Sequence, residues 1–241
     1  WVSFSGPHTP WDPPRPYDTL YDPEAIPMPV RHPGELEEKH PRWVDCLART
    51  IPATPPRSLD PDLPGGVERA YARFPDAQVR AMCAAYYGQI THIDAQVGRV
   101  LECLEARGLR ENTLVVFTSD HGDYLGNNWA FFKYGALYDS LARVPFLVSW
   151  PGRADAGARC DALVSLVDLA PTFLDAAGAA PVNPPDGRSL RALLRGDTAG
   201  WRDAVTTEGG EAAAVVTAEW RYLRWRDGFE ELYHRRDDPH D

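Results

Sequence analysis

The chain has 241 residues and a formal net charge of −10 at neutral pH, with 35 acidic against 25 basic residues. This length is sufficient for one full domain with a substantial core, and the acidic balance argues against binding to nucleic acid. No apolar run approaches the roughly 18 residues that a membrane-spanning helix needs, and no signal peptide is recognisable. Because the sequence opens on the apolar segment WVSFS without an initiator Met, we expect the natural start of the protein to lie upstream.

The cysteines are scattered along the chain and show no C-x-x-C spacing. Two of them, Cys83 and Cys103, fall on the apolar side of an expected helix. We therefore predict that Cys46, Cys83, Cys103 and Cys160 are small core residues, and that they form neither a disulfide framework nor a zinc site.

The first residues predict the end of a buried strand, and a proline-rich segment, GPHTPWDPPRPY, follows them. Prolines hold this backbone in extended or turn conformations, so His8 is restricted in position, as suits a group that contacts a ligand. A loop histidine that packs on Trp11 is the simpler local alternative. Residues 13–64 are predicted to be irregular, with one short helix at 35–49 and apolar anchors at Trp43, Val44 and Leu47.

The clearest periodicity in the sequence covers residues 75–107. Apolar side chains recur there every three or four residues, which predicts a long amphipathic helix packed on the core and ended by Gly108. His92 and Asp94 fall within this helix and could be catalytic, but a polar pair on a helix face is more often a hydrogen-bonded part of the structure, and we favour that interpretation. A short connection then leads to the next strand, which is the type of step that builds a parallel sheet.

The stretch that points most directly to function is TLVVFTSDHGDYLG, residues 113–126. It predicts a buried strand at 114–118, followed by a loop that presents Asp120, His121 and Asp123. Ligands of α/β sheets collect outside the carboxyl ends of the strands, and Asp and neutral His are common ligands of divalent metals. An ordinary surface turn fits the same residues, so at this point the two interpretations carry equal weight.

A second polar candidate, Lys133, lies within the aromatic run FFKY. Aromatic neighbours restrict the positions that the ammonium group can reach, which suits a lysine that contacts a ligand. The alternative is a surface lysine whose stem covers apolar neighbours, and it loses weight because only two of the 25 basic residues are lysines.

The remainder of the chain predicts a strand and a helix, followed by a region made of short antiparallel strands. A buried strand is expected at 144–150, and 163–177 should begin extended and end as a helix with Asp168 as a cap, before a loop at 181–187. The final part predicts hairpin-forming strands at 204–208, 213–217 and 220–226.

Four segments, in this order, resemble the C-terminal half of the sulfatase family in the alkaline phosphatase superfamily: FSGPHTPWDPP, ITHIDAQVGRVLECLEARGLRENTLVVFTSDHG, FFKYGALYDSLARVPFLVSWPG and ELYHRRDDPHD. The resemblance implies an α/β fold with a mostly parallel central sheet flanked by helices, incomplete in this chain, and a small antiparallel C-terminal appendage. Residues 1–197 would be the C-terminal part of the catalytic domain, with 13–75 as an irregular insertion near the site, and 198–241 would be the C-terminal subdomain.

The resemblance also implies roles for four residues. Asp120 and His121 match the pair that completes the divalent metal shell, which usually holds calcium, with manganese in some relatives; many sulfatases have Asn in place of His121. His8 matches the histidine that contacts the sulfate group and assists the leaving oxygen, and Lys133 matches the lysine that bridges the sulfate and the bridging oxygen. A metal, a lysine and a proton donor around one tetrahedral centre stabilise the charge that develops during ester cleavage.

Two departures from the family pattern matter. Relatives often continue the DHG loop with LGEHG or LGDHG, whereas this chain has LGNNW, so the second histidine is lost or replaced by Asn127 or Asn128. The family nucleophile is a Cys or Ser in C/S-x-P-x-R that becomes formylglycine, and it lies upstream together with an Asp pair for the metal. Residues 149–153 fit this pattern as a string, but they end an expected strand at the family's PG turn, and we reject them.

The expected function is therefore a portion of a metal-dependent sulfuric ester hydrolase. The chain holds half of a metal site and no nucleophile, so on its own it should be inactive. A phosphonate monoester or phosphodiester hydrolase of the same superfamily is one alternative, and a noncatalytic scaffold that binds or assembles is another. The expected partner is a small sulfate or phosphonate ester, whereas the compartment and the organic part of the substrate stay open.

Overall fold

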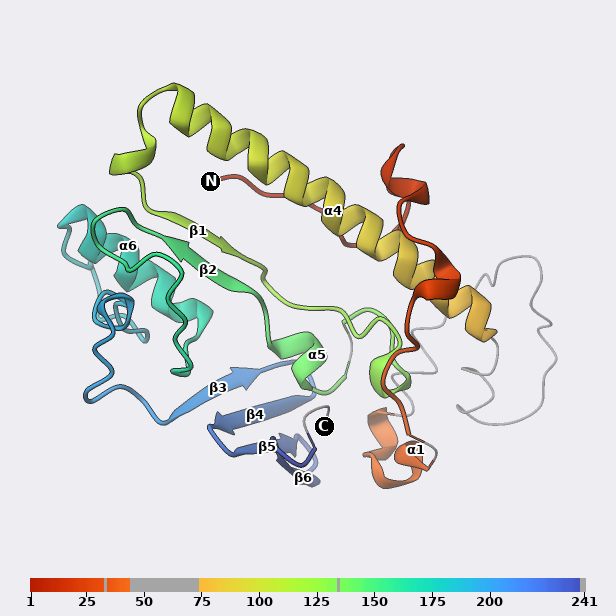
Figure 1. Cartoon of the computed structure of the whole chain (residues 1–241). Coiled ribbons are helices and arrows are strands. Elements are labelled where there is room, and N and C mark those ends of the chain that lie inside the picture. The colour runs from red at the N-terminus through yellow and green to blue at the C-terminus, as the bar shows by residue number, and fades with distance from the viewer. Residues whose placement is uncertain (33, 44–73, 134, 239–241) are drawn as a thin grey trace. The chain divides into compact units, whose positions relative to one another are not determined.

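The computed structural model describes residues 1–32, 34–43, 74–133 and 135–238 (Figure 1). These residues belong to two compact units. The first unit comprises Trp1–Arg107 and Asp123–Gly135, and the second comprises Gly108–Gly122 and Ala136–Asp241. The predicted boundary after residue 197 stays a prediction. Three residues of the sequence analysis, Val44, Cys46 and Leu47, lie outside the described residues.

Helix α4, Asp76–Ala106, dominates the first unit and confirms the helix predicted at 75–107. Its buried residues, Val79, Cys83, Ala84 and Gly88, all lie in its N-terminal half. Ile90 and Val100, further along the same apolar stripe, are exposed. The predicted packing of this stripe on the core is therefore confirmed only for its first part. No helix of the described residues is both long and apolar enough to cross a membrane.

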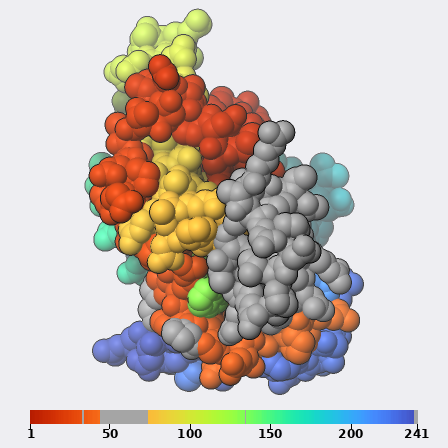
Figure 2. Space-filling view, turned by 90° about the vertical axis from the view of Figure 1, so that its right-hand side faces the viewer, coloured from red at the N-terminus to blue at the C-terminus, as the bar shows by residue number. Residues whose placement is uncertain are grey.

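The N-terminal segment lies along α4, where Figure 2 shows it in red over the yellow part of the helix. It contains the short 3-10 helices η1 (Tyr17–Thr19) and η2 (Pro23–Ala25). A Cβ atom on Gly88 would lie 2.4 Å from the carbonyl oxygen of Tyr17, so only glycine permits this approach. The rings of Tyr17 and His92 are 4.9 Å apart, which agrees with the predicted structural role of His92.

The predicted short helix in the insertion is confirmed in part. Helix α1 covers Glu35–Glu38, and residues 41–43 form a further helical turn. Trp43 is fully buried and packs edge-on against Tyr124 at 5.2 Å between ring centroids, as expected for an apolar anchor.

The prediction of a strand at the N-terminus is wrong. Trp1–Ser5 is exposed and is not part of a strand. A strand is stable only beside a partner that supplies ladder hydrogen bonds, and no described strand pairs with this segment.

The second unit begins with η3 (Arg110–Asn112) and contains strands β1 (Val115–Thr118) and β2 (Phe146–Ser149), close to the predicted strands. The two strands pair antiparallel, with Thr118 opposite Phe146. The connection between them leaves and returns at the same end of the sheet, which makes the strands run in opposite directions. The described strands therefore do not show the predicted mostly parallel sheet, and exposed Phe117 and Leu147 show that they are only partly buried.

The C-terminal part of the second unit confirms the predicted antiparallel strands. A four-stranded meander has the order β3-β4-β5-β6, and the bounds are β3 Ala204–Glu208, β4 Ala212–Thr217, β5 Trp220–Trp225 and β6 Glu230–His234 (Figure 1). Alternate residues of β4 and β5 are buried, which is the pattern of a sheet with one face on a core. Besides η3, the described helices of this unit are α5 (Asp139–Ala142), η5 (Leu166–Asp168), α6 (Leu169–Ala177) and η6 (Leu193–Arg195).

The prediction that the cysteines are core residues holds for Cys83, which is buried, and is wrong for Cys103 and Cys160, which are exposed. Cys103 lies in the C-terminal half of α4, where no residue of the apolar stripe is fully buried. Cys160 lies in an exposed loop, where no periodic pattern indicated burial. All three are free thiols.

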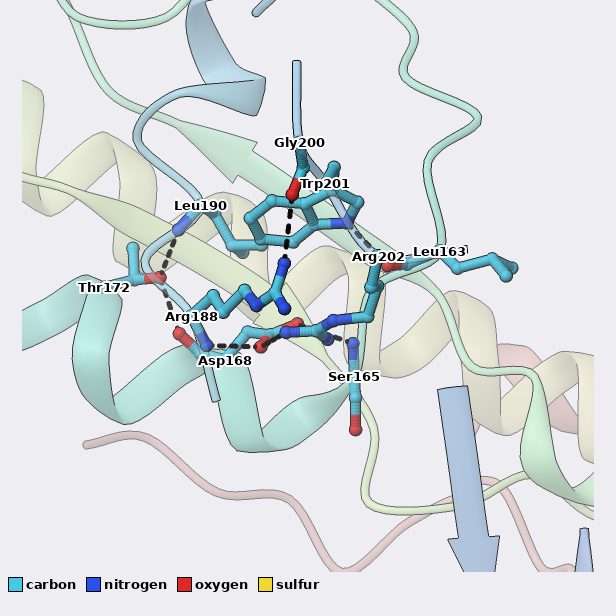
Figure 3. A network of polar contacts seen from close by, with 9 residues as sticks. All are labelled: Leu163, Ser165, Asp168, Thr172, Arg188, Leu190, Gly200, Trp201 and Arg202. Carbon is cyan, nitrogen blue, oxygen red and sulfur yellow. Dashed lines mark hydrogen bonds and ion pairs between the residues drawn. The ribbon is translucent and has the colours of Figure 1, made fainter. Parts of the chain in front are cut away.

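A buried ion pair connects the start of α6 to later segments of the second unit (Figure 3). Asp168 is fully buried, and both its carboxylate oxygens lie 2.6 Å from guanidinium nitrogens of Arg202. The same carboxylate accepts hydrogen bonds from the backbone N–H groups of Ser165, at 2.9 Å, and Arg188, at 2.8 Å. The bond from Ser165 is part of a capping box of η5, in which Ser165 is the N-cap and Asp168 is the third residue. Asp168 also occupies the N-cap position of α6 but makes no side-chain cap bond to that helix, so the predicted cap is confirmed in position only.

Replacement of Asp168 should destabilise the protein strongly, because it leaves the mostly buried Arg202 guanidinium group and two backbone N–H groups without their acceptor. We expect Asp168→Ala to lower the free energy of unfolding by about 3–5 kcal/mol, measured by urea denaturation. Asp186→Ala, in an exposed loop of the same unit, is the matched control and should change it by less than about 0.5 kcal/mol. Equal effects of the two substitutions would contradict a clamp at Asp168.

Candidate functional site

The DHG loop of the second unit presents Asp120 and His121 directly after β1. The Asp120 side chain is 86% exposed and that of His121 is 35% exposed. Nδ1 of His121 lies 2.7 Å from the carbonyl oxygen of Gly122, which can only accept, so Nδ1 carries the proton. In a neutral ring, the lone pair is then on Nε2, which is the nitrogen that faces Asp120, 3.6 Å from Oδ2.

This pair has the donor chemistry of part of a metal shell. Ligands at about 2.0–2.6 Å from one cation are roughly 3–4 Å apart, and the Nε2–Oδ2 distance of 3.6 Å lies in that range. Within the described ranges, no group of three or more His, Cys, Asp or Glu residues could hold a metal ion. Two donor atoms could supply only part of the coordination shell of a divalent cation.

Gly122 determines how the DHG loop is held. Its N–H donates to the carbonyl oxygen of Leu141 at 2.7 Å, and a Cβ atom at this position would lie 2.1 Å from the carbonyl oxygen of Ser140. Only glycine permits so close a backbone contact. Ser119 adds a hydrogen bond from Oγ to the carbonyl oxygen of His121, at 2.8 Å.

The other two predicted site residues, His8 and Lys133, are exposed and lie in the first unit. Nδ1 of His8 lies 2.8 Å from the carbonyl oxygen of Thr9, so its Nε2 is again the nitrogen that can exchange a proton with a ligand. Trp11, which follows His8, stacks on Phe132, which precedes Lys133, with 5.5 Å between ring centroids. The structure therefore joins the His8 segment to the Lys133 segment, and the Trp11 ring packs on Phe132 and its neighbours.

The loop before Lys133 has an unusual backbone. Four non-glycine residues have positive φ angles: Leu125, Asn128, Trp129 and Phe132. Such conformations are unfavourable and persist only where surrounding contacts enforce them. Asp123 supplies part of this enforcement, because its Oδ1 accepts from the backbone N–H groups of Leu125, at 2.8 Å, and Phe132, at 3.0 Å.

Asp123 is therefore the residue whose role the sequence analysis missed. The Asp-His-Gly-Asp spacing suggested a side chain presented with Asp120 and His121, whereas the structure shows a carboxylate that closes its own loop and fixes Phe132. The sequence did contain an indication of this role: a short polar side chain at the start of a loop commonly accepts hydrogen bonds from nearby backbone N–H groups.

The two asparagines that depart from the family pattern have structural contacts. Oδ1 of Asn127 accepts from the backbone N–H of Val30 at 2.8 Å, and Nδ2 of Asn128 donates to Oε1 of Glu35 at 2.8 Å. They hold the loop before Lys133 to the segment that leads into α1. Both asparagines therefore have structural contacts, and neither is among the four predicted site residues.

Two side chains that could be mistaken for nucleophiles also have structural environments. Burial raises the pKa of the Cys83 thiol to about 11, and the Asp123 carboxylate adds to this shift, so the reactive thiolate is scarce at neutral pH. Ser149 is the last residue of β2, and its hydroxyl accepts a hydrogen bond of 2.6 Å from Nη2 of Arg110.

Comparison with known proteins identifies the class of this chain. The sequence profile described as Sulfatase matches residues 1–179, and that described as N-sulphoglucosamine sulphohydrolase, C-terminal, matches residues 127–241. An arylsulfatase of Clostridium perfringens is 34% identical over 96% of this chain and 45% of its own length. The chain belongs to the sulfatase family of the alkaline phosphatase superfamily.

Solved structures agree in fold and extend the range of related activities. Phosphonate monoester hydrolases superpose with a TM-score of 0.82 at 28% identity for the Agrobacterium radiobacter protein, and 0.80 at 29% for the Silicibacter pomeroyi protein. The matches cover 99% and 95% of this chain, and 50% and 48% of those proteins. The fold is therefore alkaline phosphatase-like, and the chain spans about half the length of the relatives that it matches.

Removing the Asp123 carboxylate should loosen the loop before Lys133. We expect Asp123→Ala to accelerate amide hydrogen exchange at Leu125 and Phe132 by about 10- to 100-fold, because bonds to a charged acceptor are stronger than neutral ones. Asp94→Ala, at an exposed position of α4, should leave both amides protected. Unchanged exchange at Phe132 in Asp123→Ala would show that other contacts suffice to hold the loop.

Proposed function

We propose that this chain is a portion of a metal-dependent sulfuric ester hydrolase that uses a formylglycine nucleophile. The observation that carries the proposal is the Asp120–His121 pair at the end of β1, with two metal-binding donor atoms 3.6 Å apart in a member of the sulfatase family. Because the chain spans about half the length of its relatives, the activity is assigned to a full-length protein. By full-length protein we mean a polypeptide that contains this chain together with the regions of its relatives that it does not cover.

Asp120 and His121 would hold a divalent cation as two members of its shell. The family resemblance favours calcium, whereas an imidazole nitrogen beside a carboxylate also suits manganese. When bound, the cation would stabilise negative charge on the oxygens of the ester group. Formylglycine and the remaining metal ligands are expected upstream of this chain.

His8 and Lys133 would act on the ester group itself. A protonated His8 can donate its Nε2 proton to the leaving oxygen, and the Lys133 ammonium can stabilise the negative charge of the sulfate. The contact between Trp11 and Phe132 supports a common task for the two segments, because it holds both in one packed arrangement.

The family fold also suggests how the sheet is completed. β1 and β2 leave the apolar side chains of Phe117 and Leu147 exposed, as expected if further strands or helices cover them in the full-length protein. We propose that the mostly parallel central sheet of the family is formed there, with the present chain supplying part of it.

A phosphonate monoester hydrolase is the second candidate, favoured by the TM-scores of 0.80 and 0.82 to two such enzymes. The full-length protein should be assayed in parallel with an aryl sulfate and an aryl phosphonate monoester. A higher kcat/KM for the sulfate supports the first proposal, and an equal or higher kcat/KM for the phosphonate replaces it with the second.

Asp120→Ala should abolish metal-dependent turnover by the full-length protein, because a carboxylate ligand is lost. After chelation and titration with Ca²⁺ or Mn²⁺, we expect a weaker metal affinity and activity at background. Asp155→Ala, at an exposed position of the same unit, is the control and should behave as wild type. Full activity with unchanged affinity in Asp120→Ala would remove Asp120 from the metal site.

The two lysines of this chain give a matched pair of substitutions. Lys133→Ala should lower kcat/KM by about 10²–10³-fold, as loss of one charge-stabilising group does, with little change in melting temperature, because Lys133 is exposed. Lys39 is buried, with its Nζ 3.7 Å from Glu35 Oε1, so Lys39→Ala should lower the melting temperature instead. A collapse of stability in Lys133→Ala would mean that this lysine is structural.

A further inference from the structure

The C-terminal sheet of the second unit carries two buried charged residues on its inner face. Arg221 of β5 is 2% exposed, and Glu231 of β6 is 8% exposed. Burial of a charge is unfavourable unless partners compensate for the loss of water. The partners of these two side chains include a segment far away in the sequence, residues 137–139, which leads into α5.

Arg221 holds this segment at two points. Its Nη1 donates to the carbonyl oxygen of Leu137 at 2.6 Å, and its Nη2 forms an ion pair with Oδ1 of Asp139. One guanidinium group therefore fixes both a backbone carbonyl and the side chain of the first residue of α5.

Glu231 holds the residue between them. Its carboxylate accepts a hydrogen bond of 2.8 Å from the Tyr138 hydroxyl. It also accepts hydrogen bonds of 2.5 Å from the Trp225 indole N–H and from the Tyr233 hydroxyl. The rings of Tyr138 and Tyr233 pack edge-on with 6.0 Å between centroids. Every residue from Leu137 to Asp139 is thus held by the C-terminal sheet.

The same segment continues directly into the contact that holds the DHG loop. Tyr138 caps α5, and its carbonyl oxygen accepts the N–H of Leu141 at 3.0 Å. The Leu141 carbonyl in turn accepts the N–H of Gly122, and the Gly122 carbonyl binds Nδ1 of His121 at 2.7 Å. The orientation of the His121 ring, and with it the position of Nε2, therefore depends on where α5 lies.

We propose that the C-terminal sheet positions the Asp120–His121 metal ligands, and that Arg221 and Glu231 are the positioning residues through which it acts. This inference rests on the proposed metal-binding role of the pair. Neither residue contacts the metal or the ester; both act through α5 and Gly122. Groups that orient metal ligands from outside the shell typically contribute 10- to 100-fold to metal affinity or activity.

The test uses Arg221→Lys and Glu231→Gln, with Arg224→Lys, an exposed arginine of the same strand, as the matched control. In the full-length protein without metal, we expect both variants to accelerate amide exchange at Gly122 by about tenfold, while the amides of β1 keep their protection. The control should change neither. This readout requires no bound metal and no turnover.

Metal binding gives the second readout. The apparent Kd for Mn²⁺ should rise by about 10- to 100-fold in both variants, with an unchanged KM for the ester, and saturating Mn²⁺ should restore kcat. A purely structural role predicts a loss of folded protein that added metal does not repair, and that result would overturn the proposal. Asp120→Ala should not be rescued by metal, because the ligand itself is missing.

A milder variant keeps the proposal falsifiable if the charge substitutions unfold the unit. Tyr138→Phe removes only the hydroxyl group that donates a hydrogen bond to Glu231. Wild-type protection of Gly122 in a folded Tyr138→Phe protein would overturn the proposal, and selective loss of that protection would support it. Unchanged metal affinity in Asp120→Ala would refute the proposed metal site. Amide exchange at Gly122 tests instead whether the C-terminal sheet holds the DHG loop, so a failure of the metal site can be distinguished from a failure of the positioning role.

Discussion

The arrangement of the second unit depends on the close backbone contact between Gly122 and residues Ser140 and Leu141. A Cβ atom at position 122 would lie 2.1 Å from a carbonyl oxygen, so the DHG loop reaches α5 only because this residue is glycine. The contact connects the end of β1 to the start of β2, and it places the carbonyl that orients His121. The contact thereby helps to hold the His121 ring, and with it Nε2, close to the Asp120 carboxylate.

Buried polar side chains of the second unit join segments that are distant in sequence. Asp168 and Arg202 join α6 to the chain before β3, and Arg221 and Glu231 join the C-terminal sheet to α5. Each carboxylate receives several donors, which offsets the cost of removing its charge from water. In the first unit Asp123 has the same function on a smaller scale, since it holds a loop whose φ angles are unfavourable.

Predictions from the sequence failed where a segment needed a partner that a local pattern cannot specify. Trp1–Ser5 has the composition of a strand, but none of the described strands pairs with it. Cys103 lies on an apolar stripe whose fully buried residues are all in the N-terminal half of α4. β1 and β2 were located correctly, yet their antiparallel pairing depends on the path of the chain between them.

The sequence by itself located the long helix, the strands β1 to β5 and the family, and it singled out His8, Asp120, His121 and Lys133 as candidate site residues. It could do so because periodicity, prolines, glycines and short motifs act within a few residues of one another. Only the tertiary structure decided that Asp123 closes its own loop, that Trp11 meets Phe132, and that Arg221 and Glu231 hold α5. These roles depend on contacts between residues far apart in the chain, which arise only when the elements pack.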